Sequence, residues 1–310
     1  MTEAWITLAT NDFYTQGALT LLNSLRSSGT TRKVHCLITN QVSSTIRQEL
    51  EHKFDDVTVV DVFNSNDAEN LALIGRPDLG VTFTKLHCWR LTQYSKAVFL
   101  DADTMVVQNA DELFDRPDFS AAADIGWPDM FNSGVFVYTP SLDSYRALLA
   151  LATSSGSFDG GDQGLLNEFF SNWRDLPSAH RLPFIYNMTG GEFYSYAAAY
   201  KRYGGQTKIV HFIGAHKPWI VGSGSGSHSG SEGLHRIEHY DKWHSFSQQT
   251  HPGQEHKQQK EHQEPERVHV ESELRRFAWE AGHPDYLGED AFKNIQKALD
   301  ESLADEKRSD

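Results

Sequence analysis

The chain has 310 residues, 39% of them hydrophobic, and a formal net charge of -14. This acidic balance excludes a polyanion such as nucleic acid as the main partner, but it allows a nucleotide, because one metal ion reverses the local potential. Cys36 and Cys88 lie in apolar segments and are interpreted as reduced core thiols. The sequence has neither a basic-then-apolar leader nor an apolar run of about 18 residues, so we expect a cytoplasmic protein with no membrane segment.

The first third of the chain alternates apolar strand patterns with helical ones. Residues 5–9, 34–39 and 57–62 are typical of strands, whereas 18–25 and 43–54 have apolar residues at helical spacing. This order of elements predicts a parallel sheet with right-handed crossovers. Ligands of such sheets bind beyond the carboxyl ends of the strands.

Further elements follow the same logic. We expect helices at 83–94, 141–152 and 161–170, and strands at 97–100, 105–107, 121–124, 134–138 and 209–213. Together these elements predict a single α/β domain over residues 1–221, with a mixed, mostly parallel sheet.

The stretch Lys96 to Gln108 (KAVFLDADTMVVQ) carries the strongest chemical signal. Apolar β-formers flank Asp101 and Asp103, and alternate residues of an extended chain point to the same face. Two adjacent carboxylates are unfavourable unless a cation neutralises them, and a divalent cation with open positions for phosphate oxygens does so. The alternative is an acidic turn that closes a hairpin.

The composition changes after residue 221. Residues 222–233 are almost entirely Gly and Ser, and nine histidines lie among polar residues between 228 and 283. We therefore predict a disordered linker over 222–283.

The tail, 284–310, regains a helical pattern. Its apolar residues Phe292, Ile295, Leu299 and Leu303 form one stripe, which predicts an amphipathic helix that docks in a partner's groove. Packing of this helix on the globular domain is the alternative.

Four motifs stand in order along the chain. They are FLDADT (99–104), FNSGVF (131–136), DGGDQGLLN (159–167) and HFIGAHKPW (211–219). Over roughly residues 4–221 the chain resembles the family 8 retaining glycosyltransferases, and within that family the self-glucosylating enzymes that prime glycogen synthesis. The resemblance implies a GT-A-type, Rossmann-like nucleotide-sugar domain.

The resemblance also implies a metal site. In the family, the Asp-x-Asp carboxylates and a later histidine, here Asp101, Asp103 and His211, hold Mn²⁺ against the diphosphate of UDP-glucose. An imidazole ligand favours Mn²⁺ over Mg²⁺, which is the alternative metal. The metal would neutralise UDP as it departs. Taken alone, His211 would be interpreted as a core strand histidine, and Lys217 six residues later favours the ligand interpretation.

Other motif residues match the family's donor site. The resemblance implies a uridine-binding loop with Tyr14 stacked on the base, two lysines near the phosphates, and a group of side chains that bind the sugar hydroxyls. The loop residues are Leu8, Thr10, Asn11 and Tyr14; the lysines are Lys85 and Lys217; Arg76, Ala102 and Gly214 complete the nucleotide site; and Asn132, Ser133, Asp159 and Gln163 bind the sugar.

Asp162 is expected to lie nearest the anomeric carbon, with Asp159 and Lys85 beside it as catalytic residues. A carboxylate there stabilises oxocarbenium character, as in glycosidases. Two routes stay open, namely covalent attack by Asp162 and entry of the acceptor on the leaving-group face. A helix-entry turn with an N-cap is the structural alternative for Asp159 to Asp162.

The resemblance implies that Tyr194 is the acceptor of the first glucose and that the enzyme then extends an α-1,4-glucan. A phenol has a pKa of about 10, so this oxygen needs a base. The family acts as a homodimer and binds glycogen synthase through its tail. The alternatives are a retaining galactosyltransferase with a separate small acceptor, and a scaffold that only recruits the synthase. The acceptor motif for N-glycosylation at Asn187 is interpreted as chance.

Overall fold

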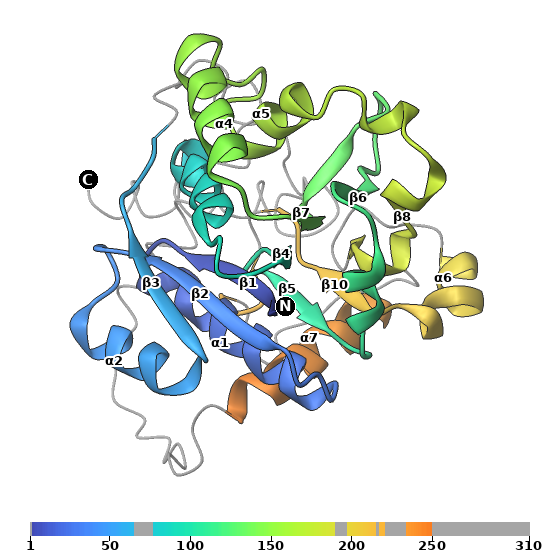
Figure 1. Ribbon diagram of the computed structural model, residues 1–310. Coiled ribbons are helices and arrows are strands. Elements are labelled where there is room, and N and C mark those ends of the chain that lie inside the picture. The colour runs from blue at the N-terminus through green and yellow to red at the C-terminus, as the bar shows by residue number, and fades with distance from the viewer. Residues whose placement is uncertain (1, 65–76, 190–196, 215–216, 221–233, 250–310) are drawn as a thin grey trace, which may run out of the picture. The chain divides into compact units, whose positions relative to one another are not determined.

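The computed structural model describes residues 2–64, 77–189, 197–214, 217–220 and 234–249 (Figure 1). The chain divides into two units, residues 1–254 and 255–310, and the described residues all belong to the first. The tail predicted at 284–310 lies outside them.

The first unit is built on a seven-stranded sheet with the order β3-β2-β1-β4-β7-β6-β8. Its strands are β1 (Glu3–Ala9), β2 (Lys33–Thr39), β3 (Asp56–Val60), β4 (Lys96–Leu100), β6 (Ser120–Ala123), β7 (Phe131–Tyr138) and β8 (Arg181–Leu182). β3, β2, β1 and β4 are parallel, and β7 is antiparallel to both β4 and β6. The predicted mixed, mostly parallel sheet is confirmed.

A second, three-stranded sheet joins β5 (Thr104–Val106), β10 (Ile209–His211) and β9 (Met188–Thr189), with β10 in the middle. β10 is antiparallel to β5 and parallel to β9. Because β5 follows β4 after a short turn, the two sheets meet where β4 ends.

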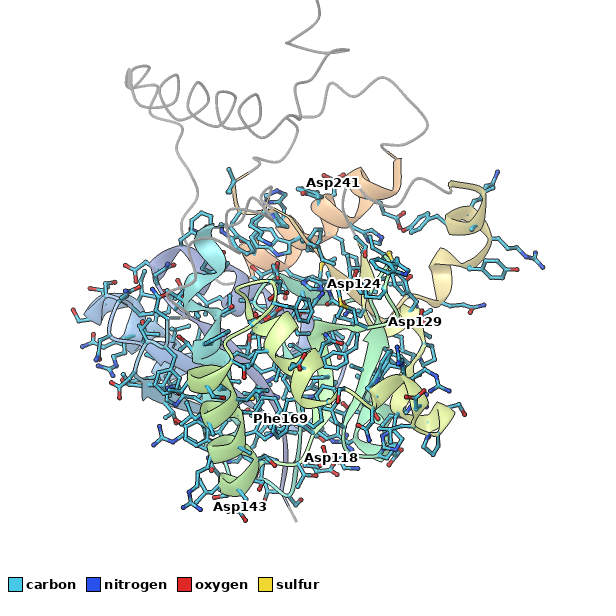
Figure 2. The ribbon with its side chains drawn as sticks, turned by 90° about the horizontal axis from the view of Figure 1, so that it is seen from above. Asp118, Asp124, Asp129, Asp143, Phe169 and Asp241 are labelled. Atoms are coloured by element: carbon cyan, nitrogen blue, oxygen red, sulfur yellow. The ribbon has the colours of Figure 1, made fainter. Side chains whose placement is uncertain are left out.

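Helices cover both faces of the main sheet (Figure 1). The α-helices are α1 (Asp12–Ser27), α2 (Ser44–Lys53), α4 (Leu142–Ser154), α5 (Asp162–Phe169), α6 (Ala197–Tyr203) and α7 (Leu234–Gln248); the 3-10 helices are η1 (Pro77–Arg90), η2 (Asp111–Asp115), η3 (Trp173–Asp175), η4 (Ser178–His180), η5 (Phe184–Tyr186) and η6 (Gly204–Gln206). α1 and α2 pack on one apolar core. η1, α4 and α5 pack on the other, and α4 and α5 carry Asp143 and Phe169 in Figure 2. The helix expected at 83–94 is η1, a 3-10 helix.

α7 corrects the predicted boundary of the globular part. It lies inside 222–283, so the prediction of a disordered linker is wrong for Leu234–Gln248. Tyr240 and Trp243 are buried against the small sheet, and the carbonyl of Phe246 accepts a hydrogen bond from Asn23 of α1 at 2.8 Å. Among the helices of the described residues, none has the length and apolar character needed to cross a bilayer.

Candidate active site

A cavity opens at the carboxyl ends of β1 and β4, where a ligand of a parallel sheet is expected. Its lining comes from β1, α1, η1, α5, the turn after β4 and the segment after β10. The lining residues are Leu8, Thr10, Tyr14, Val81, Thr82, Lys85, Asp101, Ala102, Asp103, Asp162 and Lys217. All except Val81 and Thr82 belong to the donor site that the sequence predicts.

The turn between β4 and β5 carries Asp101 and Asp103. The N–H and the hydroxyl of Thr104 both donate to the Asp101 carbonyl, at 3.0 and 2.7 Å, and close the turn. The expected extended geometry for the two aspartates is therefore wrong. The turn nevertheless brings both carboxylates near His211, and one ligand atom from each of the three residues lies within 4.8 Å of the others. These residues form a candidate metal site.

Gly17 lets α1 approach this turn. A Cβ at residue 17 would lie 2.4 Å from the carbonyl oxygen of Ala102 and 2.8 Å from the ring of Trp219. The Trp219 ring packs edge-on against Tyr14, with 5.9 Å between ring centroids. This packing holds the segment that carries Lys217 at the cavity.

Two buried lysines balance the carboxylates. The ammonium group of Lys217 contacts the carboxylate of Asp103. Lys85 Nζ lies 2.9 Å from Asp101 Oδ1 and also contacts Asp162. The cavity therefore holds three carboxylates and two ammonium groups, an arrangement that gains from one further cation.

The pKa values of the two aspartates of the turn are shifted in opposite directions. Desolvation by the surrounding protein raises the pKa of Asp101, and Lys85 offsets only part of this effect. For Asp103, desolvation acts in the same direction, but the ammonium group of Lys217 and, in its protonated form, the imidazole of His211 outweigh it and hold the pKa below its ordinary range. Burial disfavours the charged form of Lys85, yet the carboxylates that it contacts raise its pKa.

Asp162 is the first residue of α5 and is held by Thr82, Ser133 and Lys85. Its N–H donates to Thr82 Oγ1 at 3.0 Å, and its Oδ2 accepts from Ser133 Oγ at 2.8 Å. The Ser133 carbonyl accepts from Lys85 Nζ at 3.2 Å, and the Ser133 N–H donates to Gln163 Oε1 at 3.2 Å. β7 and α5 thus fix the carboxylate of Asp162 on the cavity wall.

Asp159 is bound to its own loop. Its carboxylate accepts from Ser157 Oγ at 2.7 Å and from the N–H of Gly161 at 2.9 Å. Burial raises its pKa. A Cβ at Gly164 would lie 2.3 Å from Asp159 Oδ1, so the glycine allows this loop to pack on α5.

A chain of side-chain hydrogen bonds leads from Asp124 to His211. Asp124 Oδ2 accepts from Asn132 Nδ2 and from Gln163 Nε2, both at 3.0 Å. Asn132 Oδ1 accepts from Asn187 Nδ2 at 2.8 Å, and Asn187 Oδ1 lies 2.9 Å from His211 Nδ1. Asp124, labelled in Figure 2, directly follows β6. No sequence signal singles out Asp124. Asn187, whose glycosylation motif was interpreted as chance, is buried.

Of the remaining expected site residues, Asn11 and Gly214 are described by the structure, and Arg76 and Tyr194 are not. Asn11 is the N-cap of α1 and accepts from the N–H of Tyr14 at 3.2 Å, and Gly214 adopts a φ of 101°, which favours glycine. Arg76 and Tyr194 lie outside the described residues.

Two solved glycosyltransferases share this architecture. The chain superposes on apo GlyE of Streptococcus pneumoniae TIGR4 with a TM-score of 0.53 and 20% identity, covering 80% of this chain and 60% of that one. It superposes on the galactosyltransferase LgtC with a TM-score of 0.51 and 16% identity, covering 79% and 95%. At these identities the likeness establishes the fold alone. The chain therefore has a GT-A-like α/β fold.

Sequence comparisons identify the family. The glycosyl transferase family 8 profile matches residues 5–221. Glycogenin-1 of Oryctolagus cuniculus is 45% identical over 97% of this chain and 99% of its own length. Glycogenin-1 of Caenorhabditis elegans is 70% identical over 78% of this chain, which spans 54% of that relative. The chain therefore belongs to glycosyl transferase family 8 and, within it, to the glycogenins.

Proposed function

We propose that this chain transfers glucose from UDP-glucose to its own Tyr194, with retention of configuration, and then extends an α-1,4-glucan that primes glycogen synthase. The observation that carries the proposal is a cavity lined by Asp101, Asp103 and two lysines in a glycogenin-type chain, with His211 placed next to the two aspartates as a third candidate ligand. The separate-acceptor alternative has only a fold-level likeness, because LgtC is 16% identical.

The cavity lining suits a nucleotide diphosphate at one end. Leu8, Thr10 and Tyr14 surround the place for the uridine, and the Tyr14 ring offers a stacking face. Lys217 supplies the ammonium group for the diphosphate. Its contact with Asp103 keeps this charge at the cavity before the donor arrives.

The candidate ligands fit Mn²⁺. His211 Nε2 and Asp103 Oδ1 lie 3.3 Å apart, and with a neutral imidazole that bears its proton on Nδ1 both atoms present lone pairs. Two carboxylates and an imidazole suit Mn²⁺ better than Mg²⁺. When bound, the metal neutralises charge that develops on the departing UDP.

At the other end of the cavity, Asp162 faces the place for the glucose. Lys85 and Ser133 direct their donor atoms at one of its oxygens, so the carboxylate is fixed in orientation before the donor binds. A preorganised anion stabilises positive charge at the anomeric carbon. Asp159, Asn132 and Gln163 are assigned to the sugar hydroxyls, with one N–H of Asn132 and one of Gln163 already committed to Asp124.

Tyr194, the proposed acceptor, stays a prediction, because it lies outside the described residues. The same holds for the helix at 284–310, which we assign to glycogen synthase, and for the homodimer in which one subunit glucosylates the other.

Intact-mass spectrometry tests the proposal. Incubation of the full chain with UDP-glucose and MnCl₂ should raise its mass in steps of one hexose. Tyr194→Phe should abolish the increase, whereas Tyr203→Phe, at an exposed position on α6, should preserve it. An unchanged mass in folded, donor-binding protein contradicts self-glucosylation. Hexose on Tyr194→Phe shows that another residue is the acceptor.

A further inference from the structure

Asn187 contacts the candidate metal ligand His211 at Nδ1, whereas the other ring nitrogen of His211 lies near Asp103. It lies one residue before β9, which pairs in parallel with β10 so that Thr189 is opposite His211. Asn187 is 3% exposed and His211 is 5% exposed. Both side chains are shielded from water, so their hydrogen-bond partners in the protein determine the orientation of the amide and the protonated nitrogen of the imidazole.

The surroundings impose a single orientation on Asn187. The N–H of Gly134 can only donate, and it donates to Asn132 Oδ1 at 2.9 Å. This atom is therefore an oxygen, and the atom of Asn187 that lies 2.8 Å from it must be the amide nitrogen. The other end agrees, because the Asp124 carboxylate can only accept, and it accepts from Asn132 Nδ2. The oxygen of Asn187 accordingly faces the imidazole.

The orientation of Asn187 determines the tautomer of His211. Asn187 Oδ1 lies 2.9 Å from His211 Nδ1 and can only accept, so Nδ1 carries the proton. In the neutral ring, Nε2 then has a lone pair, and this atom is the one that lies toward Asp103. Metal-bound histidines are oriented in this way by a partner on the other ring nitrogen.

The imidazole has no room to turn away from this arrangement. A Cβ at Gly134 would lie 2.1 Å from His211 Cε1 and 2.5 Å from Nδ1, so the ring packs directly on the backbone of β7. The same glycine donates the N–H that orients Asn132. One short segment of β7 therefore both confines the ring and begins the hydrogen-bond chain.

We infer that Asn187 is a positioning residue, which holds His211 in the Nδ1–H tautomer so that Nε2 is presented to the metal. The inference rests on the proposed metal site. It predicts that loss of the Asn187 oxygen weakens metal binding although Asn187 lies outside the set Asp101, Asp103 and His211. A merely structural role would lower stability and leave the tautomer and the metal affinity unchanged.

The first test measures Mn²⁺ binding to the full chain in the presence of UDP. Binding is monitored by the loss of the EPR signal of free Mn²⁺. Asn187→Leu removes the side-chain carbonyl and NH₂ groups at similar volume and should weaken Mn²⁺ binding about ten- to a hundredfold. Asn187→Asp keeps an acceptor for His211 and should recover part of the affinity. Asn167→Leu is the matched control, because the Asn167 amide bonds the backbone of Phe131 and Gln163 and is not in the chain of side chains that leads to His211. The Mn²⁺ affinity of this variant should equal that of the wild type.

Nitrogen-15 NMR of the metal-free protein at pH about 8 provides the second test, since each neutral tautomer has a distinct pair of ring-nitrogen shifts. The wild type and Asn187→Asp should show the Nδ1–H form, and Asn187→Leu should lose it. A wild-type His211 in the Nε2–H form overturns the inference. So does an Asn187→Leu protein with unchanged tautomer and Mn²⁺ affinity.

The two tests separate this inference from the proposed function. A wild-type chain that binds no Mn²⁺ but keeps the Nδ1–H tautomer contradicts the metal site and supports the positioning role. If Asn187→Leu fails to fold, the wild-type tautomer and the Asn187→Asp affinity still decide the matter.

Discussion

Lys85 Nζ lies 2.9 Å from Asp101 Oδ1, in a cavity that both residues line. The same ammonium group contacts Asp162, so one buried cation joins the candidate metal site to the residue expected beside the anomeric carbon. The lysine thus compensates charge in the donor-free protein, and a metal ion held by Asp101 would compete with it for this carboxylate.

Lys85→Met tests this compensation. Removal of one partner from a buried ion pair leaves an uncompensated charge, so we expect the free energy of unfolding without metal to fall by about 3 kcal/mol. Mn²⁺ should stabilise the variant more than the wild type, because the ion replaces the missing positive charge. Thermal unfolding with and without MnCl₂ measures both effects.

The control for Lys85→Met is Lys53→Met. Lys53 pairs with Glu49 at 2.7 Å on the surface of α2, where an ion pair contributes little. Equal losses in the two variants, or equal stabilisation of Lys85→Met and wild type by Mn²⁺, would contradict the account.

Gly134→Ala should displace His211. The added Cβ would lie 2.1 Å from the ring in a strand buried on both faces, so the imidazole must move. We expect a loss of about 1–3 kcal/mol in stability. We also expect a fall in glucosyl transfer on the order of a hundredfold, since a ligand is misplaced. Gly205→Ala, which adds a Cβ in open space, should change neither, and wild-type transfer by Gly134→Ala would refute the tight packing.

Trp243→Ala tests the placement of α7. Trp243 is 2% exposed in the core beside the small sheet, whereas Trp127 is 94% exposed. Truncation of a buried aromatic residue typically costs about 3–5 kcal/mol, so we expect a loss of this size at Trp243. The same truncation at Trp127 should cost little. Chemical denaturation of the two variants measures the difference, and similar midpoints would argue that α7 does not pack on the domain.

Acid should destabilise the protein through His35. This buried imidazole donates from Nδ1 to Tyr94 at 3.0 Å, because the Tyr94 hydroxyl itself donates to Asp56, and its Nε2 accepts from Thr58 at 2.9 Å. Desolvation by burial lowers the pKa of His35 to about 4 from 6.5. Between these values the unfolded chain binds the proton and the folded chain does not, so stability falls as pH falls.

The expected size of this effect is about 2 kcal/mol between pH 7 and pH 5. Urea unfolding at both pH values measures it. His35→Gln removes the titrating group, so its loss over the same interval should be smaller by this amount. An equal loss in wild type and His35→Gln would assign the acid sensitivity to other groups.

The periodic spacing of apolar residues in the sequence predicts the main sheet and most of its helices. The alternation of strands and helices in the first third predicts three parallel strands, and the motifs predict most of the cavity lining. The carboxylates of Asp101 and Asp103 meet as expected, although the local backbone is a turn, because the hydrogen bonds of Thr104 to Asp101 depend on atoms that a periodicity argument does not see.

The packing of α7 and the role of Asn187 could not be predicted from the periodic spacing of apolar residues, for physical reasons. Among the α7 side chains that the structure describes, the apolar ones in the core are Tyr240, Trp243 and the partly buried Phe246, and they stand among charged and polar neighbours. The composition of α7 therefore resembles that of a linker. The role of Asn187 depends on Asn132 and Gly134, which lie more than fifty residues away in sequence, and single amides carry no local signature.

The central claim is that a metal ion held by Asp101, Asp103 and His211 carries the diphosphate of the donor. A crystal of the full chain grown with MnCl₂ and UDP-glucose, with diffraction recorded at the manganese edge, tests it most directly. The account predicts one anomalous peak within bonding distance of all three residues and of the diphosphate. A donor bound with its manganese peak elsewhere, or with no peak, would contradict it.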